Sequence, residues 1–114
     1  MENSNNLERR VFERFSVELP VRFIDIYRYQ EGEGKTVDIS AKGIGMVTEQ
    51  NLTPFTPVEL WVDTPLQHQT FYARGEVVWS KPISENLWRI GLEFERADLM
   101  GVAQLLRLSK KTKN

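Results

Sequence analysis

Two short polar motifs, about two dozen residues apart, together have the chemistry to hold a phosphorylated guanine nucleotide. One is Arg-x-x-x-Arg, preceded by a further arginine, and the other is Asp-x-Ser-x-x-Gly. Guanidinium groups are planar and permanently charged, and they match both phosphate oxygens and the acceptor edge of guanine, while a carboxylate suits the guanine edge that only donates. The candidate binding residues are Arg9, Arg10, Arg14, Asp38, Ser40 and Gly43.

Each motif also has a purely structural interpretation when it is taken alone. The arginines can belong to a solvated leader neutralised by nearby glutamates, where like charges four residues apart on a helix repel modestly unless an anion binds them. In the second motif, Asp38 and Ser40 can bond to the backbone amides of a hairpin in which Gly43 is left-handed. The functional alternative is that this turn offers its amides, the Ser40 hydroxyl and Lys42 to an anion. The occurrence of both motifs in this order favours a binding site.

Composition narrows the class of protein. The 114-residue chain has the size of one domain and contains no cysteine, which excludes disulfides and thiol catalysis. Its formal net charge of −1 argues against a general nucleic-acid-binding protein, because such proteins carry a large basic excess. The polar start lacks the features of a secretory signal, and no segment approaches the ~20 apolar residues of a membrane span. We therefore expect a cytoplasmic protein without nucleic-acid partners or membrane insertion.

Apolar and polar residues alternate in several short segments separated by turn residues, a pattern typical of strands. The segments expected to be strands are 17–23, 35–40, 44–48, 58–63, 71–80 and 87–94. Pro20 cannot donate to a strand ladder and indicates an edge or a bulge, and residues 28–34, with Gly32 and Gly34, are expected to form a loop. This spacing favours an all-β fold, a small antiparallel barrel or sandwich.

The second of these strands places the Asp-x-Ser pair. If Val37 and Ile39 face the core, strand alternation puts Asp38 and Ser40 side by side on the outer surface, roughly 7 Å apart. We therefore expect them to form the rigid half of a surface site.

The two ends of the chain differ from its middle. Residues 1–15 have few apolar anchors and are expected to be a flexible arm that carries the arginines. Residues 16–108 are expected to be the barrel together with a helix that begins at Asp98 and whose apolar positions recur with helical spacing. Residues 109–114 are expected to be a solvated, disordered basic tail.

The order and spacing of these motifs resemble the PilZ domain family of bacterial cyclic di-GMP receptors. The resemblance covers residues 8 to about 108. It includes two later segments, Gly75-Glu-Val-Val-Trp79 and Arg89-Ile-Gly91-Leu-Glu-Phe94. It implies a six-stranded antiparallel β-barrel with a C-terminal helix, which agrees with the strand pattern above.

The same resemblance implies roles for the motif residues. Arg10 and Arg14 would surround the phosphates of the ligand and stack on or bond to guanine. Asp38 and Ser40 would meet the other side of the ligand, and Gly43 would allow the turn.

Stoichiometry and output are also implied by the resemblance. In this family an arginine directly before the first motif arginine tends to accompany an intercalated ligand dimer, so Arg9 implies two cyclic di-GMP molecules per domain. We expect a stand-alone receptor whose arm is ordered by the ligand and which then recruits or releases an unidentified effector protein. The alternative is a nucleotide-independent protein-interaction adaptor of the same family.

Other kinds of chemistry have less support. There is no pairing of nucleophile and base, no metal-ligand spacing and no further phosphate loop, so we expect neither an enzyme nor a metal or cofactor site.

The single histidine, His68, is interpreted as a surface loop residue. Trp79 and Trp88 are interpreted as core or barrel rim, with Trp79 lining the ligand site as the alternative. Arg89 is interpreted as a surface arginine, unless its strand lies beside that of Asp38. A small nucleic-acid-binding barrel is a last alternative, which the acidic balance disfavours.

Overall fold

The computed structural model describes residues 14–65, 70–97, 107 and 110–111, and most of these residues lie in antiparallel strands. The strands are β1 (Phe15–Ser16), β2 (Pro20–Asp25), β3 (Gln30–Ile39), β4 (Gly43–Thr48), β5 (Pro57–Asp63), β6 (Thr70–Ser84), β7 (Leu87–Ala97) and β8 (Lys110–Lys111). Within this part of the chain, no helix is long and apolar enough to cross a membrane.

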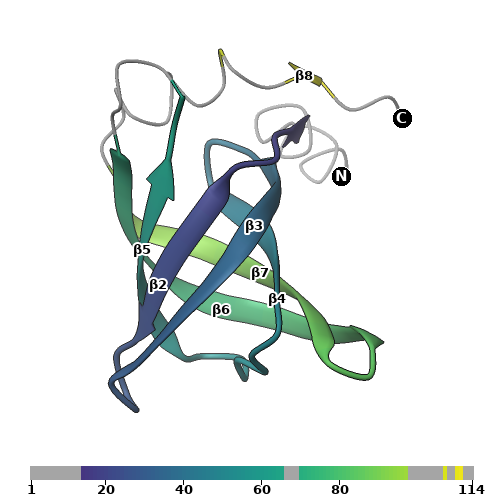
Figure 1. Cartoon of the computed structure of the whole chain (residues 1–114). Coiled ribbons are helices and arrows are strands. Elements are labelled where there is room, and N and C mark those ends of the chain that lie inside the picture. Colours follow the sequence, from purple (N-terminus) through teal and green to yellow (C-terminus); the bar gives the residue numbers. More distant parts are fainter. Residues whose placement is uncertain (1–13, 66–69, 98–106, 108–109, 112–114) are drawn as a thin grey trace, which may run out of the picture.

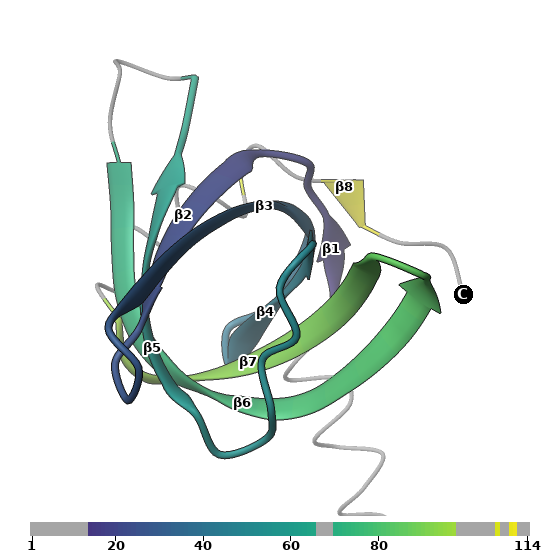
Figure 2. The same cartoon turned by 60° about the horizontal axis from the view of Figure 1, so that its bottom comes forward.

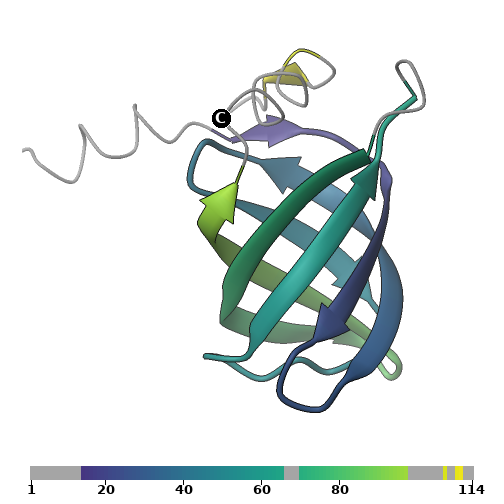
Figure 3. The same cartoon turned by 90° about the vertical axis from the view of Figure 1, so that its left-hand side faces the viewer.

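Six of these strands close into a barrel in the order β2-β5-β6-β7-β4-β3, because β3 pairs back with β2. Figures 1 and 3 show the strands wrapping around one interior. Figure 2 looks into the barrel and shows the short β1 beside the end of β3. The long β3 therefore pairs with β2 along its first half and with β1 at its last two residues. The predicted six-stranded antiparallel barrel is confirmed.

Alternate residues of the strands fill the interior. In β5, Val58, Leu60 and Val62 are fully buried, whereas the residues between them are partly exposed. The ring of Phe71 packs edge-on against that of Phe94, with 5.9 Å between the ring centroids. Burial of such side chains stabilises a fold by about 1.5–3 kcal/mol each. The packed interior thus stabilises the barrel and fixes the positions of the outward-facing residues.

The segment predicted as a loop, residues 28–34, is mostly strand. The turn occupies residues 26–29, and Tyr29 has a φ of 54° there. Gly32 lies in β3 directly opposite Phe23 of β2, and a Cβ atom on Gly32 would collide with the buried phenyl ring. The glycine therefore makes room for an aromatic ring rather than for a turn.

Several further predictions concern the parts of the chain before and after the barrel. Only the second part of the first predicted strand, 17–23, is a strand, because β2 begins at Pro20, where a proline costs no ladder hydrogen bond. Lys110–Lys111 pair with β1, so the predicted disordered tail is wrong at these two residues. The predicted helix from Asp98 and residues 1–13 of the predicted arm lie outside the described residues, and the domain boundaries stay a prediction.

Candidate functional site

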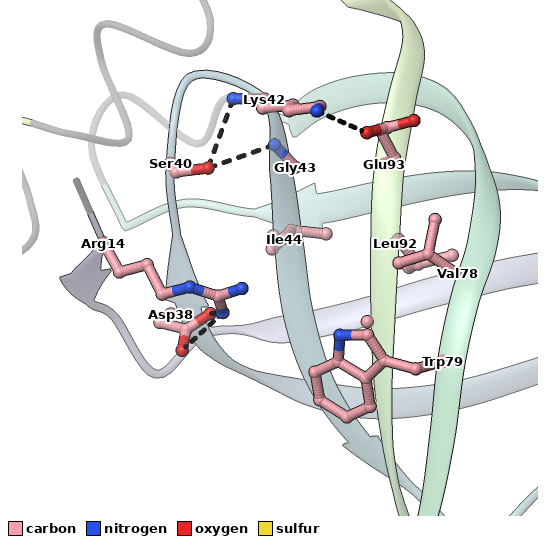
Figure 4. A pocket seen from close by; sticks show the side chains of 11 residues that line it. Arg14, Asp38, Ser40, Lys42, Gly43, Ile44, Val78, Trp79, Leu92 and Glu93 are labelled. Atoms are coloured by element: carbon pink, nitrogen blue, oxygen red, sulfur yellow. Dashed lines mark hydrogen bonds and ion pairs between the residues drawn. The ribbon is translucent and has the colours of Figure 1, made fainter. Parts of the chain in front are cut away.

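A cavity of about 230 Å³ opens on the outer side of the barrel, where the turn between β3 and β4 lies beside β7 and β6. It is lined by Arg14, Asp38, Ser40, Lys42, Gly43, Ile44, Val78, Trp79, Gly91, Leu92 and Glu93. Figure 4 shows two ion pairs in this lining, one formed by Arg14 and Asp38 and the other by Lys42 and Glu93. Apolar side chains lie between the two pairs, so the cavity has charged sides and an apolar middle.

The two sequence motifs meet in this cavity. Four of the six predicted binding residues line it, namely Arg14, Asp38, Ser40 and Gly43. Arg9 and Arg10 lie outside the described residues, as does His68. Among the residues that the structure describes, no group of three or more His, Cys, Asp or Glu side chains could hold a metal ion.

Asp38 lies on the outer side of the barrel, facing away from the buried Ile39, but its side chain is itself buried there. The pairing of β3 with β4 shifts between Thr36 and Asp38, so Val37 is the extra residue of a β-bulge. Alternation is broken at the bulge, and the Asp38 side chain is only 9% exposed. The carboxylate lies over Gly45, where a Cβ atom would be 2.8 Å from Asp38 Oδ1. The predicted outer side is therefore right for Asp38, although its side chain is covered there, whereas Val37, predicted to face the core, is only half-buried at the bulge.

Two arginines neutralise the Asp38 carboxylate. Arg14 Nη1 lies 3.3 Å from Oδ1, and Arg89 Nη2 lies 3.3 Å from Oδ2. Arg89 belongs to β7 and reaches Asp38 across β4, whose Gly45 leaves the space between them open. The sequence favoured a surface role for Arg89, but the structure brings it to the site, where its Nε is buried and has no hydrogen-bond partner among the described residues. Both oxygens of Asp38 are therefore already engaged.

Ser40 holds the turn between β3 and β4. Its hydroxyl oxygen accepts hydrogen bonds from the backbone N–H groups of Lys42 at 3.2 Å and Gly43 at 3.3 Å. This is the structural interpretation of the motif, and it is confirmed for Ser40.

No glycine in the described residues has a positive φ, so the predicted left-handed conformation of Gly43 is wrong. Gly43 is required for another reason: a Cβ atom there would collide with the carbonyl oxygen of Leu92 in β7.

This close approach brings Lys42 onto β7. Lys42 Nζ lies 3.0 Å from Glu93 Oε2, and the backbone N–H of Phe94 donates to the Lys42 carbonyl at 2.8 Å. The Lys42 and Glu93 side chains are 55% and 44% exposed. Sequence reasoning missed Glu93, and its only signal was its place in the Gly-Leu-Glu-Phe segment shared with the resembled family.

Trp79 forms part of the apolar middle of the cavity. It follows a second bulge, in β6 at Val78, and its indole lies against Gly91 of β7, where a Cβ atom would collide with the ring. The ammonium group of Lys81 lies 5.9 Å from the ring centroid. Trp79 is half-buried and lines the cavity, which was the alternative considered from the sequence. Trp88 packs against the core.

Alanine at Gly43 is expected to lower the free energy of unfolding by about 1–3 kcal/mol, because its Cβ has no space against the β7 backbone. Alanine at Gly45 is the matched control. Its Cβ would meet the movable end of the Asp38 side chain, so it should cost less stability. Urea denaturation of both variants measures the difference, and equal free energies of unfolding would contradict this role of Gly43.

Comparisons with known proteins place this chain in a family. The sequence model of the PilZ domain matches residues 8–111, and PilZ domains are ligand-binding or adaptor domains. The chain belongs to the PilZ domain family. No curated protein matches it in sequence.

Solved structures of PilZ proteins share its fold. The PilZ domain with c-di-GMP of YcgR from Escherichia coli is 17% identical with a TM-score of 0.67, and the match covers 88% of each chain. The Bacillus subtilis inhibitor of motility MotI/DgrA is 18% identical with a TM-score of 0.71. That match covers 87% of this chain and 48% of MotI/DgrA, so this chain spans about half the length of the latter. The PilZ domain of CeSA from a cellulose-synthesizing bacterium is 18% identical with a TM-score of 0.58, covering 83% of this chain and 92% of that one.

Proposed function

We propose that the chain binds cyclic di-GMP in the cavity between β3, β4 and β7. The observation that carries this proposal is that two motifs far apart in sequence line one cavity, with Arg14 directly on Asp38. The structure of the YcgR PilZ domain with c-di-GMP supports the choice of ligand. A cytoplasmic location follows from the proposal, because cyclic di-GMP is an intracellular second messenger.

Each part of the cavity suits one part of this ligand. Arg14 is 56% exposed, so it can turn from Asp38 to a phosphate, and Lys42 offers a second cation. The indole of Trp79 offers a flat surface to a guanine base. Arg9 and Arg10 would supply the remaining positive charge, and Arg9 favours two ligand molecules per domain.

The output of the domain would be a change of surface. The ligand's phosphates would draw Arg9 and Arg10 against the barrel beside Asp38 and Ser40, and the new surface would recruit or release an effector protein. Such coupling needs a ligand that contacts both the barrel and the segment before it.

Calorimetric titration with cyclic di-GMP tests this function directly. We expect saturable binding with two ligands per chain that an excess of GTP does not displace. Absence of binding would overturn the proposal, and a saturation value of one ligand per chain would overturn the stoichiometry alone.

One observation favours a second function, that of a nucleotide-independent adaptor. Tyr27, Tyr29 and Phe55 are 74%, 85% and 75% exposed in the β2–β3 and β4–β5 connections, which lie at the opposite end of the barrel from the β3–β4 turn (Figure 1). Tyr29 and Phe55 also have positive φ values of 54° and 73°. Exposed aromatic residues in strained turns are typical of contact surfaces. A partner that binds this end equally well with and without cyclic di-GMP would favour the adaptor.

A further inference from the structure

The two carboxylates that line the cavity differ in how available they are. Asp38 is 9% exposed and both of its oxygens contact arginines. Glu93 is 44% exposed and pairs with the ammonium group of Lys42. An incoming base therefore meets the Glu93 carboxylate more readily than that of Asp38.

The contact between Lys42 and Glu93 is easily exchanged. Both side chains are about half exposed, and ion pairs between exposed side chains contribute little because water screens them. Lys42 can rotate toward a phosphate, since an ammonium group is a compact donor with no preferred plane. Glu93 is then left in the cavity as an acceptor.

Charge balance makes this exchange favourable for a dianionic nucleotide. Within the described lining, Arg14 and Lys42 are balanced by Asp38 and Glu93. Two phosphates entering this neutral set compete with the carboxylates for the cations. Asp38 keeps Arg89 when Arg14 turns away, whereas Glu93 needs a new donor when Lys42 does. The Watson–Crick edge of guanine carries two adjacent donors, N1–H and N2–H, and a carboxylate has two acceptor oxygens to match them.

The position of Glu93 suits a base that lies on Trp79. Trp79 pairs with Gly91, and Glu93 lies two residues further along the same face of β7. That separation is roughly 7 Å by the rise of a strand, a span that a purine ring system can bridge. Figure 4 shows Glu93 and Trp79 on the same side of the cavity, with Leu92 and Val78 beside them.

We propose that Glu93 binds the Watson–Crick edge of a guanine and exchanges Lys42 for the base when Lys42 turns to a phosphate. The inference rests on the proposed binding of cyclic di-GMP. It makes Glu93 a specificity-determining residue, because adenine has an acceptor, N1, where guanine has a donor.

The test compares two ligands and two variants by calorimetry. The ligands are cyclic di-GMP and cyclic di-AMP with the same phosphodiester linkages, so that any base of the second ligand that faces Glu93 is an adenine. The variant is Glu93→Ala, and Glu95→Ala is the matched control, because Glu95 is 49% exposed on the same strand, pairs with Arg74 at 3.5 Å and does not line the cavity.

We expect the wild-type protein to prefer cyclic di-GMP and Glu93→Ala to lower this preference by about 10-fold, through weaker binding of cyclic di-GMP alone. Glu95→Ala should keep the wild-type preference. Equal losses for both ligands would mean that Glu93 only positions Lys42, and would overturn the inference, as would an unchanged preference. A wild-type protein that binds cyclic di-GMP without preferring it overturns this inference alone, whereas one that binds neither ligand overturns the proposed function as well.

Discussion

Replacing Arg14 with alanine is expected to weaken cyclic di-GMP binding by about 100-fold, which corresponds to the loss of one or two charge-assisted hydrogen bonds. Arg14 is the described residue of the Arg-x-x-x-Arg motif, and its guanidinium already lies at the cavity, 3.3 Å from Asp38. Because its side chain is 56% exposed, its removal should leave the barrel folded. Calorimetric titration of the variant, with a thermal melt to verify folding, measures the effect.

Arg22 provides a matched control for Arg14. It is 55% exposed and pairs with Asp63 at 3.3 Å, but it lies on β2 and does not line the cavity. Arg22→Ala therefore removes a similar ion pair and the same charge, and should leave the affinity unchanged. If both variants lose affinity equally, the effect would be general electrostatic attraction rather than contact at this cavity.

Replacing Phe23 with alanine is expected to lower the free energy of unfolding by about 3–5 kcal/mol, because it removes a ring that is 1% exposed and leaves a cavity in the core. The space cannot be filled from across the sheet, since the residue opposite is Gly32. Such a loss is a large part of the stability of a domain of this size. Urea denaturation monitored by tryptophan fluorescence measures it.

Phe55→Ala is the control for that measurement. Phe55 is 75% exposed in the β4–β5 connection and has a φ of 73°. Alanine adopts this backbone conformation at a similar cost, and little apolar surface is lost, so we expect a change within about 0.5 kcal/mol. A Phe55→Ala loss as large as that of Phe23→Ala would show that Phe55 packs against the barrel.

The class of fold could be predicted from the sequence because alternating residues such as Val58, Leu60 and Val62 carry the period of a strand with one buried face. The bulge at Val37 could not, because an extra residue leaves no mark in a two-residue period. The consequence was an incorrect core position for Val37. Tertiary packing likewise explains why residue 32 is a glycine. Its close neighbour in space is Phe23, which is not nearby in the sequence.

The candidate site was predictable where its interactions lie within a short sequence motif. Ser40 bonds within its own turn, so its role follows from residues two and three positions away. Glu93 and Arg89 join the site because β7 lies beside β4, and no local pattern in β7 indicates that neighbour. Gly43 was predicted to allow the turn through a left-handed backbone, but the structure shows that it is needed for its close approach to Leu92.

The pairing of β1 with β3 limits how far the arginines before β1 can reach. Phe15 and Ser16 are fixed opposite Ile39 and Asp38, so Arg10 can lie no more than about 14 Å from Arg14 along the chain. A tethered group is present at an effective concentration on the order of millimolar, whatever the concentration of the protein in solution. Insertion of a flexible glycine-serine linker before Phe15 should therefore weaken ligand binding gradually with linker length, although every contact group remains in the chain.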